Sequence, residues 1–343
     1  MGKVFVGLDM GSRSFHQVAL DADKAVVQDR RYETSEANLI RAFEDVRGEV
    51  HVHLEAGELA AWVRRALKGR VARVVVGHPK SSAWIAKDPL KRDRLDAFKL
   101  ADLLRTDHVH EVYYADDDRR TVFKQLVQHY DDVTDQARRL KQKIKAAFRE
   151  QGVIARGLDV YTAEGRREFI ARVVSEAARE GIRQLYGLLD ATDKIQGDAR
   201  RLLKRESRQY PEIERFEEVP GVGLVGACRY SAYVQTPHRF ATKRKLWRYF
   251  RLGITDRQSD GKPLGRQALD WNGNGRLKDL TRKAFEAARR TRQDNMFKRA
   301  FRRTLLSTHD EKHARLSTQR KIVTVLWTMW KRGERYQDDR DKG

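Results

Sequence analysis

Two β-strands joined by a tight turn are predicted for KVFVGLDMGSRSFHQVAL, residues 3–20. The halves 3–8 and 14–20 are rich in apolar residues, and the turn Gly11-Ser12-Arg13 separates them. Such runs bounded by a glycine turn are typical of paired β-strands. The first run continues into Asp9, a carboxylate at the end of an otherwise apolar strand.

Helices and strands alternate after these two strands. A third strand is predicted at 25–32, and apolar spacing predicts the elements that follow it. These are a helix at 36–46, a strand at 50–54, a helix at 59–67, a strand at 71–76 and a helix at 94–104. Three strands in a meander followed by helix, strand, helix, strand and helix is the order of a ribonuclease-H-like domain. We therefore expect an α/β domain over residues 1–115.

Four carboxylates lie at the ends of two predicted strands and at the start of a predicted helix of this domain. Asp9 and Glu55 end two strands, and adjacent parallel strands that end together would bring their side chains within reach of one metal ion. Asp93 and Asp96 are three apart at the start of a helix, so they share one face. The set could hold one or two hard cations through oxygen. The structural alternative is that the helix pair caps the helix or forms surface ion pairs with neighbouring basic residues.

The residue inventory limits the choice of metal. Cys228 is the single cysteine, and the ten histidines show no HExxH spacing. This excludes an intrachain disulfide and a multi-cysteine zinc site. Carboxylates favour a hard ion, so we expect Mg²⁺, with Mn²⁺ as the alternative.

The chain is strongly basic. Its 343 residues include 71 Lys and Arg against 49 Asp and Glu, a formal net charge of +22. This favours a nucleic-acid partner, because neutralising phosphates releases condensed counterions. A merely solubilising surface is the alternative. No apolar run approaches the roughly 18–20 residues that a bilayer span needs, and no signal peptide precedes the first strand. We expect a cytoplasmic protein without a membrane partner.

A long helical region is predicted over residues 116–210. Apolar residues from Leu126 to Ala147 alternate spacings of four and three, which is a heptad repeat that Gly152 and Gly157 end. A second stretch has the same kind of spacing, at Leu185, Leu188, Thr192, Ile195, Ala199 and Leu202. An antiparallel intrachain hairpin and an intermolecular coiled coil both fit this pattern.

The remaining residues, 211–343, are predicted to form a mainly helical domain after the boundary Tyr210-Pro211. Gly221 and Gly223 precede a helix that starts at Leu224, and such a turn can offer backbone N–H groups to a phosphate. The fold class is thus α/β plus all-α, with a central helical hairpin or coiled coil.

A polar segment at 257–275 is predicted to be an irregular loop. It holds Ser259 between Arg257 and Lys262, which we expect to contact nucleic acid. A serine can attack a phosphodiester when a base, a metal or cationic surroundings activate it. Loop serines more often only bond to the backbone.

Asp9-Met10-Gly11-Ser12 is also similar to the first phosphate loop of actin-like kinases and ATPases, which share the core fold. Such a protein should carry a second glycine-rich phosphate turn and an adenosine motif, and neither is found. The ATPase alternative predicts nucleotide binding to Asp9 and Gly11.

Several motifs together resemble the transposases of the one-ten insertion-sequence family and the related Piv-type DNA invertases, over nearly the whole chain. The motifs of the first domain are Gly7-Leu8-Asp9, Leu54-Glu55-Ala56-Gly57 and residues 91–97, KRDRLDA. Those of the last domain are residues 219–223, VPGVG, Arg239-Phe240, Leu252-Gly253-Ile254, Ser259-Asp260-Gly261, Asn272-Gly273-Asn274 and Leu277-Lys278.

The resemblance implies a RuvC-like domain whose Asp-Glu-Asp-Asp set, here Asp9, Glu55, Asp93 and Asp96, binds magnesium. It also implies a helical domain that supplies Ser259 as nucleophile to a composite site. The family is associated with a structured guide RNA that pairs with donor and target DNA, which would relieve the protein of most base readout. A homo-oligomer, a dimer or tetramer, is expected as well.

The chain departs from the family pattern near the serine. The family usually has two serines and two glycines there, and Gln258 and Asp260 replace one of each. Asp260 adds negative charge beside an incoming phosphate, and Asp270 stands where a basic residue is common.

The sequence thus predicts a guide-RNA-directed DNA transposase that works through a covalent phosphoserine. A RuvC-like nuclease that hydrolyses branched DNA, and a non-catalytic nucleic-acid-binding protein, are the alternatives.

Overall fold

The computed structural model describes residues 2–78, 93–115, 118–255, 258–259, 262–263 and 268–338, with the backbone alone at 258–259 and 262–263. It consists of two compact units, residues 1–118 and 119–343. The first boundary lies close to the one expected from sequence, while the helical hairpin and the last domain fall in the same unit. In the described part of the chain no helix is both long and apolar enough to cross a membrane.

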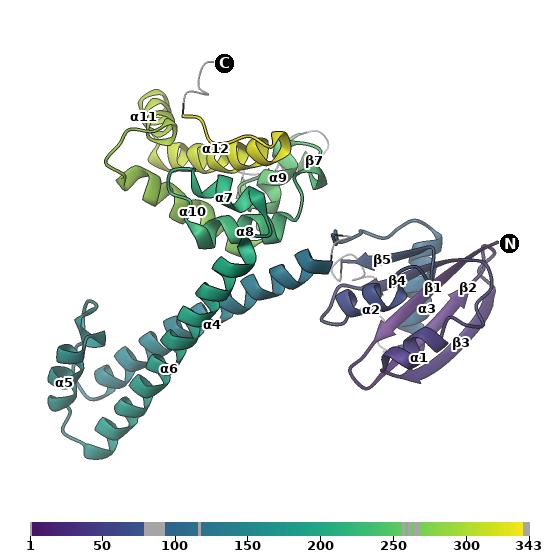
Figure 1. Cartoon of the computed structure of the whole chain (residues 1–343), viewed down its shortest axis with the longest axis horizontal. Coiled ribbons are helices and arrows are strands. Elements are labelled where there is room, and N and C mark those ends of the chain that lie inside the picture. Colours follow the sequence, from purple (N-terminus) through teal and green to yellow (C-terminus); the bar gives the residue numbers. More distant parts are fainter. Residues whose placement is uncertain are drawn as a thin grey trace. The chain divides into compact units, whose positions relative to one another are not determined.

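Unit 1 is a five-stranded mixed sheet with helices on both faces (Figure 1). Its elements are β1 (Lys3–Met10), β2 (Ser14–Leu20), β3 (Val26–Glu33), α1 (Glu36–Arg41), β4 (Glu49–Glu55), α2 (Ala60–Leu67), β5 (Arg73–Gly77) and α3 (Asp93–Arg105). The strand order is β3-β2-β1-β4-β5; β2 is antiparallel to β1 and β3, and β4 is parallel to β1 and β5. This arrangement is compatible with a ribonuclease-H-like domain.

Alternation along the strands assigns each face of the sheet to different helices. Val4, Val6 and Leu8 point into a core that α1 and α2 cover. Gly7, on the opposite face, lies under α3. The helix expected at 36–46 is shorter, because α1 ends at Arg41 and the chain continues in turns, with the Phe43 N–H donating to the Ile40 carbonyl.

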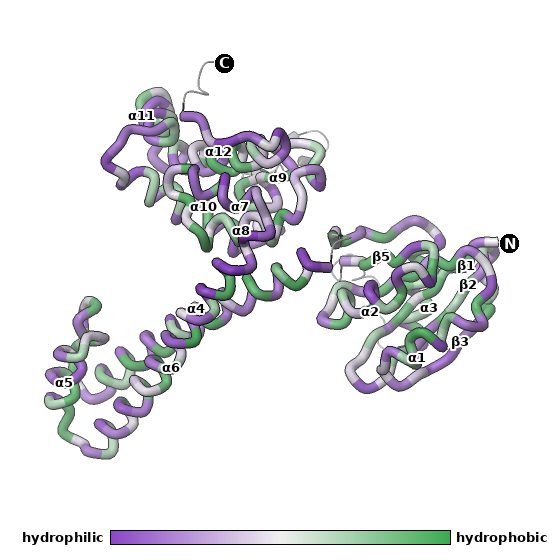
Figure 2. The backbone as a smooth tube through the Cα atoms, viewed as in Figure 1, coloured by the Kyte–Doolittle hydropathy of each residue, from purple (hydrophilic) through white to green (hydrophobic). Residues whose placement is uncertain are grey.

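Unit 2 begins with an antiparallel hairpin of α4 (Asp118–Glu150) and α6 (Glu176–Ser207), joined through a 3₁₀ turn (Asp159–Tyr161) and α5 (Ala163–Ala171). Both long helices alternate hydrophilic and hydrophobic residues along their length (Figure 2). Gly152, just after α4, has a φ of +73°, which confirms that it ends the helix. The intrachain hairpin is therefore formed, and an additional intermolecular contact stays a prediction.

The apolar seam of α6 differs from the one predicted. The buried residues are Ile182, Tyr186, Leu189, Ala199 and Leu203. Leu188 and Ile195, which the heptad reading placed in the seam, are 57% and 48% exposed. The predicted apolar positions of α6 were wrong by about one residue, because Tyr186 packs against Phe148 and occupies the seam.

The rest of unit 2 is a helical core. It comprises α7 (Pro211–Glu217), α8 (Leu224–Val234), a 3₁₀ turn (Pro237–Arg239), α9 (Lys243–Tyr249), α10 (Gly275–Arg290), α11 (Met296–Thr308) and α12 (Glu311–Arg332). Between α9 and α10, the expected irregular loop contains four two-residue strands: β6 (Ile254–Thr255), β7 (Gln258–Ser259), β8 (Lys262–Pro263) and β9 (Ala268–Leu269).

A buried ion pair joins the hairpin to this core. Asp131 of α4, 1% exposed, accepts hydrogen bonds from the Arg229 Nε at 2.7 Å and the Tyr233 hydroxyl at 3.2 Å. Arg276 of α10 pairs with Asp135 at 2.6 Å. Because a buried carboxylate is tolerated only when it is paired and hydrogen-bonded, this network fixes α4 against α8.

Candidate active site

The register of β1 and β4 brings Asp9 beside Glu55. The two strands are parallel and Leu8 is opposite Leu54, so the next residues occupy neighbouring positions at the same edge of the sheet. Asp9 is half-buried and also lies across from His16 of β2, whereas Glu55 is exposed. Asp9 and Glu55 therefore both lie at the carboxyl edge of the sheet, and their role as metal ligands stays a prediction.

Helix α3 brings the other two carboxylates toward this edge. Ala97 and Ala101 lie over Gly7. At the far end of α3, Asp102 pairs with Lys24 at 2.9 Å, and Lys24 belongs to the turn between β2 and β3, near the start of β1. The helix therefore runs opposite to β1. Its first turn, which contains Asp93 and Asp96, is directed toward the end of β1 that carries Asp9.

Close packing holds α3 in this orientation. A Cβ added to Gly7 would lie 1.9 Å from the Ala97 carbonyl oxygen, so only glycine allows the helix to approach so near. Arg94, in the first turn, donates to the carboxylate of Asp29 on β3. Asp29 also contacts His16 at 2.7 Å. Burial acts to raise the pKa of Asp29, but its hydrogen bonds with His16 and Arg94 lower that pKa overall.

The four carboxylates offer only oxygen donors, which suits a hard divalent cation. Their backbones share one edge of unit 1. Among the residues that the structure describes, however, no three His, Cys, Asp or Glu side chains are gathered into a ligand set.

The serine lies on a small hairpin in unit 2. β6 pairs with β9, and between them β7 pairs with β8, with Ser259 opposite Lys262. Arg257 and Asp260 lie outside the described residues, as do the side chains of Ser259 and Lys262. The hairpin places Ser259 and Lys262 as cross-strand neighbours.

The two glycines expected to contact phosphate have different environments. Gly221 has a φ of +88°, and a Cβ there would lie 2.1 Å from the Ala284 carbonyl oxygen, so this glycine allows α10 to pack closely. Gly223 immediately precedes α8, and a Cβ there would meet nothing within 4 Å. Both line a hollow of about 370 Å³ together with Arg200 and Lys283. Their contact with nucleic acid stays a prediction.

Two family models match the chain. Residues 6–151 match the model of the DEDD domain of IS110 elements, described as a transposase, and residues 213–301 match the model described as "Transposase IS116/IS110/IS902 family". The chain belongs to the IS110 transposase family. No curated protein matches it.

This IS110-family transposase is a DNA-processing enzyme, as the sequence predicted. The first model covers Asp9, Glu55, Asp93 and Asp96, and a DEDD-type domain implies dependence on a divalent metal. The second model covers Ser259 and both glycines of the turn before α8. Neither model supports the ATPase alternative.

His53 is a buried residue of the transposase, next to the carboxylate edge, that the sequence analysis did not single out. Its side chain is fully buried, and its Nδ1 donates to the Leu100 carbonyl of α3 at 2.7 Å. Burial lowers its pKa, which favours the neutral imidazole. Nε2 faces Gly77 and has no hydrogen-bond partner among the described residues. The bond to α3 therefore fixes the helix to β4 two residues before Glu55. The alternation of VHVHLE, residues 50–55, was the signal that could have placed this histidine against a helix.

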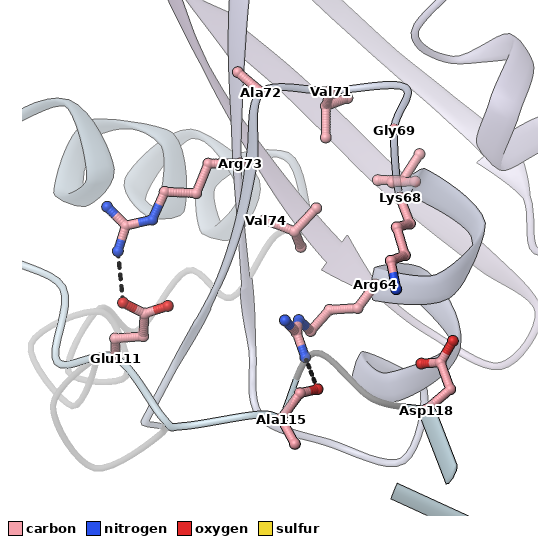
Figure 3. A pocket seen from close by; sticks show the side chains of 11 residues that line it. Arg64, Lys68, Gly69, Val71, Ala72, Arg73, Val74, Glu111, Ala115 and Asp118 are labelled. Carbon is pink, nitrogen blue, oxygen red and sulfur yellow. Dashed lines mark hydrogen bonds and ion pairs between the residues drawn. The ribbon is translucent and has the colours of Figure 1, made fainter. Parts of the chain in front are cut away.

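A separate hollow of about 330 Å³ lies at the other edge of the transposase sheet (Figure 3). It is lined by the end of α2, the start of β5, and Glu111, Ala115 and Asp118. Arg73 donates to Glu111 at 2.6 Å, and Arg64 to the Ala115 carbonyl at 3.3 Å. Because Asp9 and Glu55 lie at the ends of their strands and this hollow lies at the start of β5, it is not part of the carboxylate edge.

Proposed function

We propose that this transposase cleaves and rejoins DNA with the Ser259 hydroxyl as nucleophile and with Mg²⁺ held by Asp9, Glu55, Asp93 and Asp96. The observation that carries the proposal is the approach of two strand ends and the first turn of α3 to one edge of the sheet. The match of both transposase models, one over the carboxylates and one over the serine, supports it further.

The proposed reaction has two balanced steps. Ser259 Oγ attacks the phosphorus of a DNA phosphodiester; the Oγ–P bond forms as the bond to the leaving strand breaks, and the serine proton ends on the leaving oxygen. A hydroxyl of the second DNA strand then attacks the phosphoserine, joins that strand and regenerates the serine. A bound divalent cation would polarise the phosphate and offset charge on the leaving oxygen.

Residues of unit 1 position helix α3, and a lysine of unit 2 lies beside the serine. His53 holds α3 on β4, and Gly7 lets α3 approach β1 closely. In this proposal, both contacts keep the first turn of α3, with Asp93 and Asp96, directed toward the end of β1 that carries Asp9. Lys262, opposite Ser259, would place positive charge beside the attacked phosphate.

A structured guide RNA and a homo-oligomer are also part of the proposal. The formal charge of +22 suits two polyanionic partners. Pairing of RNA with DNA would supply sequence recognition, so that the protein itself need contact mainly backbone. A dimer or tetramer would allow several strands to be cut and rejoined together.

The test is to incubate the protein with Mg²⁺, guide RNA, donor DNA and target DNA, and to look for a protein–DNA adduct that survives SDS. Ser259→Ala should abolish the adduct and the joined product. Ser307→Ala, at an exposed serine of α11, is the matched control and should leave both intact.

The metal assignment is tested with the carboxylates. Asp9→Asn and Glu55→Gln should abolish product formation, whereas Glu44→Gln, at an exposed glutamate of the same unit, should not. Normal recombination by Ser259→Ala would exclude the serine nucleophile. Free cleaved ends without an adduct would instead identify a hydrolytic nuclease.

A further inference from the structure

Trp271 is an exposed indole on a rigid segment. Its side chain is 74% exposed. The preceding Asp270 is buried; its N–H donates to the Gly253 carbonyl and its carboxylate accepts from the Asn272 N–H, both at 2.8 Å. The Asn274 N–H donates to the Tyr249 carbonyl at 2.8 Å. These bonds fix the backbone on both sides of Trp271, so little backbone entropy would be lost when a ligand covers the indole.

A cation accompanies the ring. The Nζ of Lys278, from α10, lies 5.1 Å from the centroid of the Trp271 ring. Attraction between the ammonium and the aromatic face holds the two together. A flat apolar surface beside a positive charge matches a nucleobase and its phosphate.

A basic pocket lies beside this loop. It measures about 600 Å³ and is lined by Arg244, Trp247, Arg248, Gly253, Ile254 and Arg320. Arg320 of α12 donates through Nε and Nη2 to the Leu252 carbonyl and lies over the Trp247 ring at 5.3 Å, so its guanidinium is fixed. Arg244 is exposed and has no ion-pair partner among the described residues.

Arg248 connects the pocket to the tryptophan. It lines the pocket, and its Nε lies 3.5 Å from Asp270, the residue before Trp271. Gly253 allows this contact, since a Cβ there would lie 2.4 Å from Arg248 Cγ. The pairing of β6 with β9 begins at Ile254, so the pocket and Trp271 stand at the base of the loop that contains Ser259.

We propose that this surface, which we define as Trp271, Arg244, Arg248 and Arg320, binds a single-stranded nucleic-acid segment. One base stacks on Trp271 and the neighbouring phosphates occupy the arginine pocket. The inference rests on the proposed function, for which it supplies the surface that presents a strand to the serine loop. An acidic peptide would satisfy the arginines but would leave the exposed indole without a planar partner.

The test is a binding measurement in EDTA, which separates binding from strand cleavage. Labelled unpaired DNA and RNA oligonucleotides of the same sequence are titrated with the full chain, and fluorescence anisotropy is recorded. Trp271→Ala should weaken binding roughly 5- to 150-fold, the range for loss of one base–aromatic stack, while Trp271→Phe should retain most of the affinity. Arg244→Ala should lower the slope of log K against log salt by about 0.7, the value for one phosphate contact on a single strand.

The controls are exposed residues elsewhere in unit 2. Leu306→Ala removes an apolar side chain that is also 74% exposed, and Lys312→Ala removes an exposed cation. Both should bind like wild type. The DNA and RNA arms show which strand the surface prefers.

Three results would overturn the inference: equal affinity of Trp271→Ala and Leu306→Ala, equal competition by polyglutamate and by unlabelled oligonucleotide, or no binding of either strand by wild type. The proposed function is judged separately, by the serine adduct in Mg²⁺. If Trp271→Ala binds normally while wild type forms the adduct, only this inference fails. If Trp271→Ala loses affinity but wild type forms no adduct, only the serine mechanism fails.

Discussion

Replacing Gly7 by alanine should separate α3 from the sheet and disturb the carboxylate edge. A Cβ at this position would lie 1.9 Å from the Ala97 carbonyl oxygen and 2.6 Å from the Ala101 nitrogen. Both are backbone atoms of α3, so no side-chain rotation can relieve the contact. The helix must retreat by more than about 1 Å, or the strand must bend away from it.

The size of the effect follows from this displacement. Overpacking of a well-packed interface costs about 1–3 kcal/mol of stability, and a clash with backbone belongs at the upper end. Asp93 and Asp96 move with the helix, and a misplacement of about 1 Å at a reacting site can reduce the rate about 100-fold. We therefore expect Gly7→Ala to fold less stably and to lose about two orders of magnitude in strand-transfer rate.

Two measurements check this prediction. Amide hydrogen exchange of peptides from β1 and α3 reports local stability without assuming that the two units unfold together. Product formation is then titrated with Mg²⁺, whose half-saturation should shift upward. Gly57→Ala is the control for stability, because a Cβ there would meet nothing within 4 Å. Exchange and Mg²⁺ dependence identical to wild type would refute the described contact between α3 and Gly7.

Three further outcomes are expected in unit 2. Gly221→Ala should destabilise the helical core by about 1–3 kcal/mol, because of the positive φ and the clash with α10. Gly223→Ala should change stability little. Similar urea midpoints for the two variants would contradict the described packing of Gly221 against α10. Arg229→Met should lower the free energy of unfolding by about 3–5 kcal/mol, because it leaves Asp131 charged and buried. Adding Asp131→Leu should restore most of this loss. A double variant no more stable than the single one would argue against this pair. Burial raises the pKa of the Cys228 thiol to about 12, so iodoacetamide at about pH 8 should label it only after unfolding in urea, and rapid labelling of the native chain would disprove its burial.

Much of the candidate site could be predicted because it lies on regular elements. Asp9 and Glu55 follow apolar strand runs, and the period of two in those runs assigns their side chains to one face. His53 was missed because its partner is a backbone carbonyl of α3, 47 positions along the chain, and no local pattern reveals such a partner. Trp271 was missed because its exposure depends on the bonds of Asp270 and Asn274 to segments that precede the serine loop.

The sequence by itself determined the order of strands and helices in unit 1 and the positive charge, and it limited the proposed metal ligands to oxygen donors, because periodicity and composition are local properties. Only the tertiary structure decided that α3 runs opposite to β1 and so carries Asp93 and Asp96 toward the carboxyl edge, and that Tyr186 rather than Leu188 occupies the seam of α6. These outcomes depend on which surfaces pack most closely, through a glycine beneath a helix or an aromatic ring between two helices. Such packing arises between residues far apart in the chain, which is why spacing alone leaves it open.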